Sequence, residues 1–474
     1  MSKGSALRVR MTRARPPYAS ATPADADGTR RTPRSRLSPS KESRAMSRSR
    51  RDPARTPLRA PHPVSTLLRA PRSVPAALRG RPLAAALLTA AAALTAVPAL
   101  APAATANEGN PTVLSWGAGR TGQLGNGTLS DSLSPSSVTS LFRGDVDQVS
   151  AGGTSSANSF VLARTDKTVK SWGHNSSGQL GNGGNTNQAV PTTVPRLDNI
   201  EDIAAGGQHA LALNSSGQVF SWGDNSYGQL GNNRTGDSRT VPDRVQGMPK
   251  VKQISAGCDF SLALLQNGKV YAWGRGIHGQ LGTGNRATSS VPRQVEGLEN
   301  IVEIDAGCHH ALALTADDTV KSWGYNLYGQ LGNSSTKSST VPVDVDWLEG
   351  VSDIEAGAHH NYVKTSDSHV WGWGNNQYGQ LLEGDEAFDA NVSRTNRTAP
   401  VEIPRLEGVQ HLAAGARHGV AVTADDVFTW GHNGEGQLGN GTTVSRYESV
   451  KILNQGSAIK AVAVSLGGNT TYAY

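Results

Sequence analysis

The feature that most constrains this chain's fold is a phrase that recurs seven times. A Trp-Gly pair followed shortly by Gly-Gln-Leu appears in forms such as SWGDNSYGQLGN and SWGYNLYGQLGN. Its tryptophans are Trp116, Trp172, Trp222, Trp273, Trp323, Trp373 and Trp430, separated by 56, 50, 51, 50, 50 and 57 residues. A period near fifty residues indicates a repeat architecture, because each unit must stack on its neighbours to bury its apolar face.

Each repeat also carries the pattern of a β-hairpin. The stretch from Ile203 reads IAAGGQHALALNSSGQVFSWG, in which two alternating apolar runs flank a polar turn with a glycine. The next unit has Asn267-Gly268 at that turn, a strong hairpin signal. A proline follows each Gly-Gln-Leu segment in five units, and we expect it at the first residue of an edge strand, since proline cannot donate to a sheet. These prolines are Pro191, Pro242, Pro292, Pro342 and Pro400. About four short strands per period predict an all-β propeller blade.

The two ends of the repeat region are incomplete in complementary ways. The stretch VLSWGAGRTGQLGNG from Val113 has no Ala-Gly strand before it, and IKAVAVSLGGNTTYAY from Ile459 has no Trp-Gly after it. Together they make one blade, and pairing them hides two sheet edges. The sequence therefore predicts a seven-bladed β-propeller over residues 107–474, with a closure blade shared between the N- and C-terminal strands.

The charge of the chain divides at the start of the repeats. Residues 1–106 hold 20 Lys/Arg and 4 Asp/Glu, a net charge of +16, whereas residues 107–474 hold 25 and 34, a net charge of −9. Residues 1–81 have the composition of a basic disordered leader, which is not translated if the true start lies downstream of Met1. Residues 82–106 resemble a secretory signal peptide, with an apolar run ending in Ala104-Thr105-Ala106. We therefore expect a secreted protein, with no membrane insertion after signal cleavage and no nucleic-acid partner.

The motifs W-G-x-N-x-x-G-Q-L-G and A-G-x-x-H, at this period, resemble the regulator of chromosome condensation repeat, here in an exported bacterial-type member. The resemblance implies a seven-bladed β-propeller and a range of roles: nuclear guanine-nucleotide exchange factors, a plant UV photoreceptor and secreted bacterial β-lactamase inhibitory proteins. The photoreceptor requires tryptophans in the Ala-Gly motifs, which here read AGGQH, AGCDF, AGCHH, AGAHH and AGARH. Export separates the chain from small GTPases. Protein binding through one face of the ring is the favoured function; a secreted enzyme inhibitor and an exchange-factor-like regulator are the alternatives.

Candidate binding residues come from the positions that vary between repeats. The residue before Gly-Gln-Leu reads Thr121, Ser177, Tyr227, His278, Tyr328, Tyr378 and Glu435, so four neighbouring blades carry a ring there. Tyr325, two residues after its tryptophan, adds another ring. Rigid amphipathic rings suit interface anchors, although they also suit a role in capping the grooves between blades. We expect Tyr227, His278, Tyr325, Tyr328 and Tyr378 of a monomeric ring to bind a protein or cell-envelope partner of unknown identity.

Histidines and cysteines recur at equivalent positions of the repeat. The A-G-x-x-H motif supplies His209, His310, His360 and His418, and the phenylalanine at position 260 favours packing, with a hydrogen bond inside each blade, over a metal ring. Cys258 and Cys308 occupy equivalent positions of adjacent blades. Two buried unpaired thiols are the favoured interpretation; a disulfide is the alternative if the strands end close to the axis. We found no catalytic motif, and we therefore expect neither an enzyme nor a cofactor.

Overall fold

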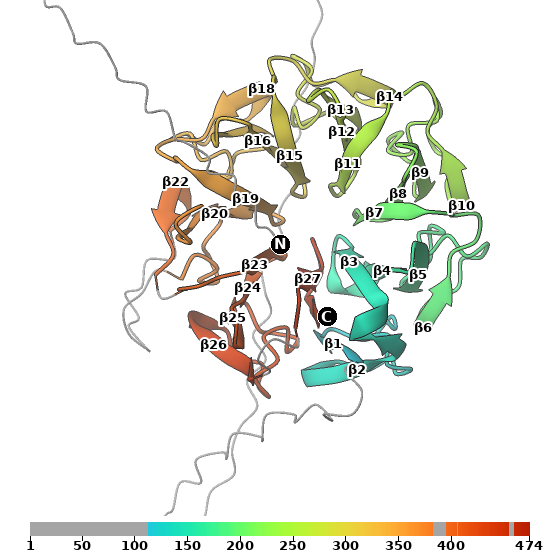
Figure 1. The fold of residues 1–474 in the computed structure, drawn as a ribbon, viewed down its shortest axis with the longest axis vertical. Helices are drawn as coiled ribbons and strands as arrows, with labels where there is room; N and C mark the ends of the chain where they lie inside the picture. The colour runs from blue at the N-terminus through green and yellow to red at the C-terminus, as the bar shows by residue number, and fades with distance from the viewer. Residues whose placement is uncertain (1–111, 383–394, 405, 455–458) are drawn as a thin grey trace, which may run out of the picture. The chain divides into compact units, whose positions relative to one another are not determined.

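Seven four-stranded antiparallel sheets form a closed ring in the computed structural model, which describes residues 112–382, 395–404, 406–454 and 459–474 (Figure 1). The predicted seven-bladed β-propeller is confirmed. The predicted leader (1–81) and signal peptide (82–106) lie outside the described residues, as do residues 107–111. Within the described ranges, no helix is both long and apolar enough to cross a membrane.

We number the blades 1 to 7 from β3, so that blade 7 combines β27 and β28 with β1 and β2. The innermost strands are β3 (Val146–Gly152), β7 (Ile200–Ala205), β11 (Val251–Ala256), β15 (Ile301–Ala306), β19 (Val351–Ala356), β23 (His411–Ala414) and β27 (Val462–Val464). The second strands are β4 (Phe160–Thr165), β8 (His209–Asn214), β12 (Phe260–Leu265), β16 (His310–Thr315), β20 (His360–Thr365), β24 (His418–Val422) and β28 (Thr470–Ala473).

The third strands, each ending in the Trp-Gly pair, are β5 (Thr168–Gly173), β9 (Val219–Gly223), β13 (Val270–Gly274), β17 (Val320–Gly324), β21 (Val370–Gly374), β25 (Asp426–Gly431) and β1 (Thr112–Gly117). The outer strands are β6 (Gln188–Thr193), β10 (Arg239–Arg244), β14 (Ser289–Gln294), β18 (Ser339–Asp344), β22 (Arg397–Glu402), β26 (Arg446–Asn454) and β2 (Ser132–Phe142). Two single-turn 3₁₀ helices are η1 (Arg143–Asp145) and η2 (Ser156–Asn158).

The ring closes by pairing the two ends of the repeat region. β1 lies antiparallel to β28, with Leu114 opposite Ala473 and Gly117 opposite Thr470. β28 pairs in turn with β27, the innermost strand of blade 7. Since both edges of the central pair are occupied, neither chain end leaves an open strand inside the sheet.

The prolines of the repeat lie on the outer edge strands, but not at the first residue. Pro191, for example, is in the middle of β6, in a stretch where the register between β5 and β6 shifts. The same shift recurs between the third and outer strands of blades 2 to 5. Proline is tolerated inside the strand because the ladder is already interrupted there, so the predicted strand began too late.

The seven repeated tryptophans form the centre of the interfaces between blades. All seven have fully buried side chains. Each indole Nε1 donates a hydrogen bond to the main-chain carbonyl of the Gly-Gln-Leu glutamine in the preceding blade, at 2.8–3.0 Å. The series includes Trp116, which reaches Gln437 and so joins the two ends of the chain. One such interblade hydrogen bond therefore recurs with every repeat.

Three of the four motif histidines bond to a side chain of the next blade, whereas the sequence predicted a hydrogen bond inside each blade. The imidazole of His360 has no hydrogen-bond partner among the described residues. His209 Nε2 is 2.9 Å from Ser261 Oγ, and His418 Nε2 is 3.0 Å from Thr471 Oγ1, in both cases across the interface. Ser261 and Thr471 pass the contact on to the glutamine carbonyl that also receives the indole. Burial lowers the pKa of His209 to about 4 and that of His418 to about 3, so both rings are neutral at pH 7.

The indole bonds predict unequal costs for two tryptophan substitutions. Trp222→Phe should lower the free energy of unfolding by about 1–3 kcal/mol, because it leaves a buried carbonyl short of a donor and opens a small cavity. Trp347→Phe should change it by less than about 0.5 kcal/mol, because that side chain is 79% exposed. Urea unfolding measures both values, and equal costs would contradict the role given to the repeated indoles.

The buried histidines predict a dependence of stability on pH. A folded pKa of about 3 for His418 lies below the unfolded value of 6.5, so its contribution is present above pH 6.5 and is lost as the pH falls toward 3. Between pH 7 and pH 5 this one group should cost the wild type about 2 kcal/mol. His418→Gln should therefore be closer in stability to the wild type at pH 5 than at pH 7, measured by urea unfolding; a constant difference would refute the assignment.

Candidate functional site

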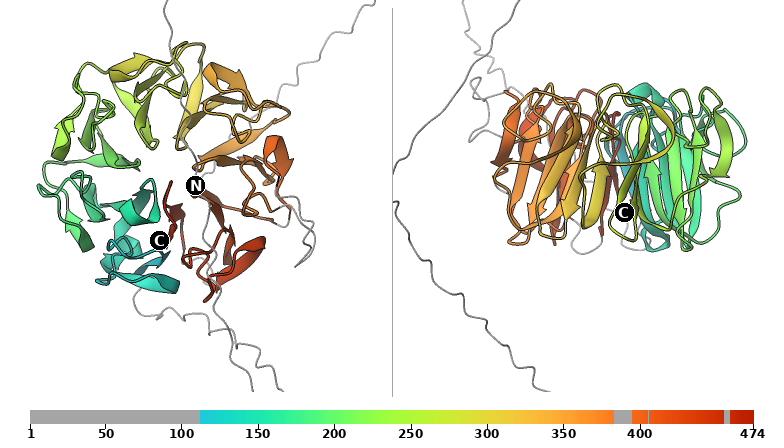
Figure 2. Two further views of the ribbon diagram at one scale, coloured as in Figure 1. Left: turned by 180° about the vertical axis from the view of Figure 1, so that it is seen from behind. Right: turned by 90° about the horizontal axis from the view of Figure 1, so that it is seen from above.

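One face of the ring carries all the positions that the sequence predicted for binding. In each blade the chain runs along the innermost strand, through the Ala-Gly turn and back along the second strand. It then passes through the hairpin turn and along the third strand to the Gly-Gln-Leu loop. Because neighbouring strands are antiparallel, the Ala-Gly turn and the Gly-Gln-Leu loop lie at the same end of every blade, and the hairpin turns and interblade linkers lie at the other. We call the first end the GQL face; the ring is seen edge-on in Figure 2.

On the GQL face, the residue before Gly-Gln-Leu contacts the next blade. Tyr328 of blade 4 packs on His359 in the Ala-Gly turn of blade 5, with ring centroids 5.1 Å apart. Ser177 Oγ of blade 1 donates to Gln208 Oε1 of blade 2 at 3.0 Å. These side chains therefore cover the grooves between blades. Tyr328, like its four companions among the predicted residues, is only half-buried, so part of each ring remains accessible.

Five rings of blades 3 to 5 form a continuous cluster, which we call the aromatic arc. Its members are His278, His309, Tyr325, Tyr328 and His359. Tyr325 is central, with its centroid 5.0 Å from His278 and 6.1 Å from Tyr328, and both contacts are edge-to-face. His309 and His359 follow at 6.4 and 6.3 Å from it. Edge-to-face packing suits aromatic quadrupoles and holds the rings in place.

The other two predicted tyrosines flank the arc, each beneath an arginine of the next blade. The Arg275 guanidinium lies 4.6 Å from the Tyr227 ring centroid, and that of Arg417 lies 5.1 Å from the Tyr378 centroid. Tyr378 also packs on His432 at 4.6 Å. The structure thus brings His278, Tyr325 and Tyr328 together and places Tyr227 and Tyr378 at separate cation–π contacts on either side.

Two exposed apolar side chains lie beside the arc. Ile277 is 43% exposed and Leu327 is 59% exposed, at equivalent loop positions of adjacent blades. The same position holds Ser226 and Gln377 in the flanking blades. Scattered exposed apolar residues are ordinary, but two next to a ring cluster give the arc an apolar rim.

The imidazoles of the arc are uncharged at neutral pH. Burial lowers the pKa of His309 to about 4 and that of His359 to about 3, and neighbouring imidazoles and the Arg417 charge lower the His359 pKa further. Burial also lowers the pKa of His278, with the Arg275 charge acting in the same direction. The arc therefore presents polar but neutral rings, which resemble tyrosine more than lysine in their contact chemistry.

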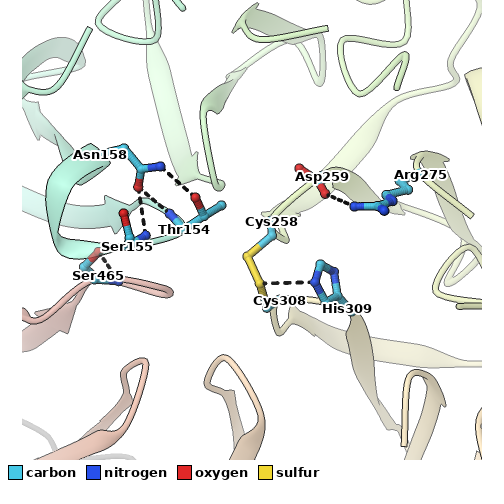
Figure 3. Close-up of a disulfide and its surroundings, with 10 residues drawn as sticks. Thr154, Ser155, Asn158, Cys258, Asp259, Arg275, Cys308, His309 and Ser465 are labelled. Carbon is cyan, nitrogen blue, oxygen red and sulfur yellow. Dashed lines mark hydrogen bonds and ion pairs between the residues drawn. A yellow bond between two sulfur atoms is a disulfide. The ribbon is translucent and has the colours of Figure 1, made fainter. Parts of the chain in front are cut away.

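Cys258 and Cys308 form a disulfide at the centre of the GQL face (Figure 3). Their Cα atoms are 4.5 Å apart, well within bonding range, so the sequence preference for two free thiols is wrong. The Ala-Gly turns lie close enough to the ring axis for equivalent residues of two adjacent blades to bond. The bond joins blades 3 and 4, the blades that carry most of the arc, and His309 Nε2 is 3.8 Å from Cys308 Sγ.

The side-chain amide of each Gly-Gln-Leu glutamine shows where blades 3 and 4 differ from the others. In blades 1, 2, 5 and 6, Nε2 contacts the side chain two residues after the tryptophan, at 2.7–2.9 Å; these partners are His174, Asp224, Asn375 and His432. In blade 7, Gln123 Nε2 donates to the Ser156 carbonyl. In blades 3 and 4, the amides of Gln280 and Gln330 are buried and have no partner among the described residues.

A second set of polar groups lines the axis further from the GQL face. There the innermost strands surround a cavity of about 340 Å³ that includes Asp202 and Asp305. Asp202 Oδ2 accepts from the Ile254 amide at 3.0 Å, and Asp305 Oδ2 accepts from the Ala356 amide at 2.7 Å. Burial raises the pKa of both carboxyls. They cap the open edges of neighbouring blades, and the described residues contain no cluster arranged to hold a metal ion.

Sequence reasoning missed several residues of the face. His309 and His359 precede the core histidines, and alternation along the strand does send them to the opposite side, but nothing in one sequence showed that they meet the tyrosines. Arg417 occupies the position in the Ala-Gly motif of blade 6 that His359 occupies in blade 5. Ile277 and Leu327 could have been found by reading the fourth residue after each tryptophan, where the other blades carry Arg, Ser, Gln or Gly.

Comparison with known proteins agrees with this geometry. A family described as RCC1-like domain matches residues 112–473. The ultraviolet-B receptor UVR8 of Arabidopsis thaliana is 33% identical over 178 residues, covering 36% of this chain and 39% of that protein. Human E3 ubiquitin-protein ligase HERC2 is also 33% identical, over 174 residues, which are 36% of this chain but 4% of the ligase.

Solved structures extend the likeness over the whole ring. Yeast RCC1 (Prp20), solved bound to Kap60, has a TM-score of 0.67 at 24% identity and covers 77% of this chain and 88% of its own. Human WBSCR16 has a TM-score of 0.64 at 25% identity and covers 76% and 98%. The matches span 39% of the UVR8 receptor and 4% of HERC2, whereas the family match spans residues 112–473. This chain belongs to the family of RCC1-like domains.

Proposed function

We propose that the chain is an exported protein-binding propeller, and that the aromatic arc and its apolar rim on the GQL face hold the partner. The observation that carries the proposal is the pair of unpartnered glutamine amides. Four other blades supply an acceptor two residues after the tryptophan, whereas blades 3 and 4 have Arg275 and Tyr325 there. Each buried unpaired donor costs about 1–3 kcal/mol.

A cost of that size at two adjacent blades favours a functional explanation. Local rules of folding are broken most often where a residue serves binding. Arginine cannot accept a hydrogen bond, and the tyrosine hydroxyl is at the far end of its ring. In return the face gains the central ring of the arc and a cation–π contact. Tyrosine and arginine are the residues enriched at binding hot spots, and the neutral imidazoles around them avoid a charge penalty on desolvation.

Export is supported by two independent features. Residues 82–106 have the order of a signal peptide, and the structure pairs both cysteines of the chain. Disulfides persist in oxidising compartments and are rare in the cytosol. A propeller that folds outside the cell needs a partner in the medium or at the cell envelope.

Capture of that partner tests the role of the aromatic arc. Wild-type protein should recover it from medium and envelope extracts, whereas the Tyr325→Ala/Tyr328→Ala double variant should recover at least about tenfold less, since hot-spot truncations cost 2 kcal/mol or more. Trp347→Ala is the matched control: it removes a 79%-exposed ring from the opposite face. Quantitative mass spectrometry measures recovery. If Trp347→Ala lost the partner and the double variant retained it, the binding site would lie on the face opposite the GQL face.

The same purification tests export. Protein isolated from the medium should begin at Asn107 and show no free thiol before reduction. Protein retained in the cytoplasm with the residue 1–106 segment attached would refute the export part of the proposal and leave the face unaffected.

Two substitutions of Tyr325 separate its role in partner binding from its effect on stability. Tyr325→Asn copies blade 5, where Asn375 Oδ1 accepts from Gln380 Nε2 at 2.8 Å. It should therefore be about 1 kcal/mol more stable than Tyr325→Ala, because it satisfies the Gln330 amide. Both variants should lose partner binding to a similar degree. Equal stabilities in urea unfolding would show that the amide has another partner.

A further inference from the structure

The GQL face holds two arginine–tyrosine pairs that differ in charge balance. Arg275, over Tyr227, forms an ion pair with Asp259 at 2.9 Å (Figure 3). Arg417, over Tyr378, has no carboxylate partner among the described residues. Both guanidiniums lie on a tyrosine of the preceding blade, so the missing counter-charge is the difference between them.

Arg417 also lines a cavity at the axis of the GQL face. The cavity has a volume of about 200 Å³, and its wall includes Cys308, Ala358, His359 and Asn469. Of the described residues in the wall, Arg417 alone is ionised at neutral pH, and none is a carboxylate. The nearby Glu435 accepts from Asn469 Nδ2 at 2.9 Å. Within the described wall, the Arg417 guanidinium is therefore the single charged group among hydroxyl, amide and imidazole groups.

The charge of Arg417 is felt by the rings beside it. After burial, which is the larger cause, Arg417 lowers the pKa of His432, and it is one of the charges that lower the pKa of His359. His359 belongs both to this cavity and to the aromatic arc, and its buried Nδ1 has no partner among the described atoms. The cavity and the arc are thus one continuous surface.

We propose that this cavity binds a carboxylate of the partner polypeptide, with Arg417 as its charged ligand and the aromatic arc holding the residues next to it; the proposal rests on the proposed function of the GQL face. A guanidinium matches the two oxygens of a carboxylate. Phosphate groups are generally bound by clusters of arginines, and here a single positive charge faces the cavity. The carboxylate can come from an Asp or Glu side chain or from a chain terminus.

The alternative is that Arg417 merely covers Tyr378 with its aliphatic stem. Many exposed arginines act in this way, and such a role requires no anion. The two interpretations differ in one measurable property. A covering arginine confers no preference between peptides that differ only in charge, whereas a carboxylate ligand does.

The test uses an array of random dodecapeptides printed as matched pairs that differ only by Glu or Gln at one position. Each pair is printed with a free and with an amidated C-terminus, which separates the two sources of carboxylate. The full-length secreted protein should bind the Glu members, or the free-terminus members, at least fivefold more strongly. Arg417→Ala should reduce that ratio to about one, and Arg417→Lys should give an intermediate ratio.

Arg275→Ala is the matched control, because it removes the arginine that already has an internal carboxylate. Because Arg275 belongs to the proposed binding face, its removal should weaken the binding of both members of each pair and leave their ratio unchanged. No charge preference in the wild type, a preference that survives Arg417→Ala, or equal loss in Arg275→Ala would each overturn the proposal. Unfolding temperatures within about 2 °C of the wild type confirm that the exposed Arg417 side chain was removed without unfolding the ring.

Failure of the carboxylate site can be told apart from failure of the proposed function. If Tyr325→Ala/Tyr328→Ala keeps full partner capture but Arg417→Ala abolishes the charge preference, the cavity stands and the arc does not. If the double variant loses the partner and no peptide pair shows a preference, the arc stands and the cavity does not.

Discussion

The structure depends on one hydrogen bond repeated seven times, from an indole Nε1 to the main-chain carbonyl of a glutamine in the preceding blade. A single blade cannot bury its tryptophan, so the bond forms only when two blades stack. The last bond of the series, from Trp116 to Gln437, joins segments from opposite ends of the repeat region. Together with the pairing of β1 and β28, it makes the ring one closed unit.

The same glutamine connects the frame to the binding face. Its main-chain carbonyl receives the indole and the histidine-linked hydroxyl of the blade interface, while its side-chain carbonyl accepts from the amide two residues earlier and fixes the loop. Its Nε2 reaches the GQL face and tolerates several acceptors. The frame therefore stays constant while the face varies, and only in blades 3 and 4 does variation leave the amide without an acceptor.

The sequence alone was sufficient to predict the ring, because the repeat period and the hairpin pattern depend on residues that are neighbours within one blade. Blade number and closure followed from the complementary ends. What it could not supply was the meeting of residues from different blades: His278 of blade 3 with His309 of blade 4, or Tyr328 with His359. The Cys258–Cys308 bond was misjudged for the same reason, since the distance between equivalent residues depends on how closely the turns approach the axis. The histidine bonds were placed in the wrong blade, because a strand pattern does not show which neighbour a ring faces.

Hydrogen exchange of the indole N–H groups, followed by NMR with each signal assigned through a Trp→Phe variant, tests the closed ring most directly. The seven repeated tryptophans should exchange together, at the free energy of global unfolding, with Trp116 as slow as Trp222. Trp347, which is 79% exposed, should exchange at once. Exchange of Trp116 through a separate, lower-energy opening would show that the two ends do not close the ring, and the shared blade would have to be abandoned.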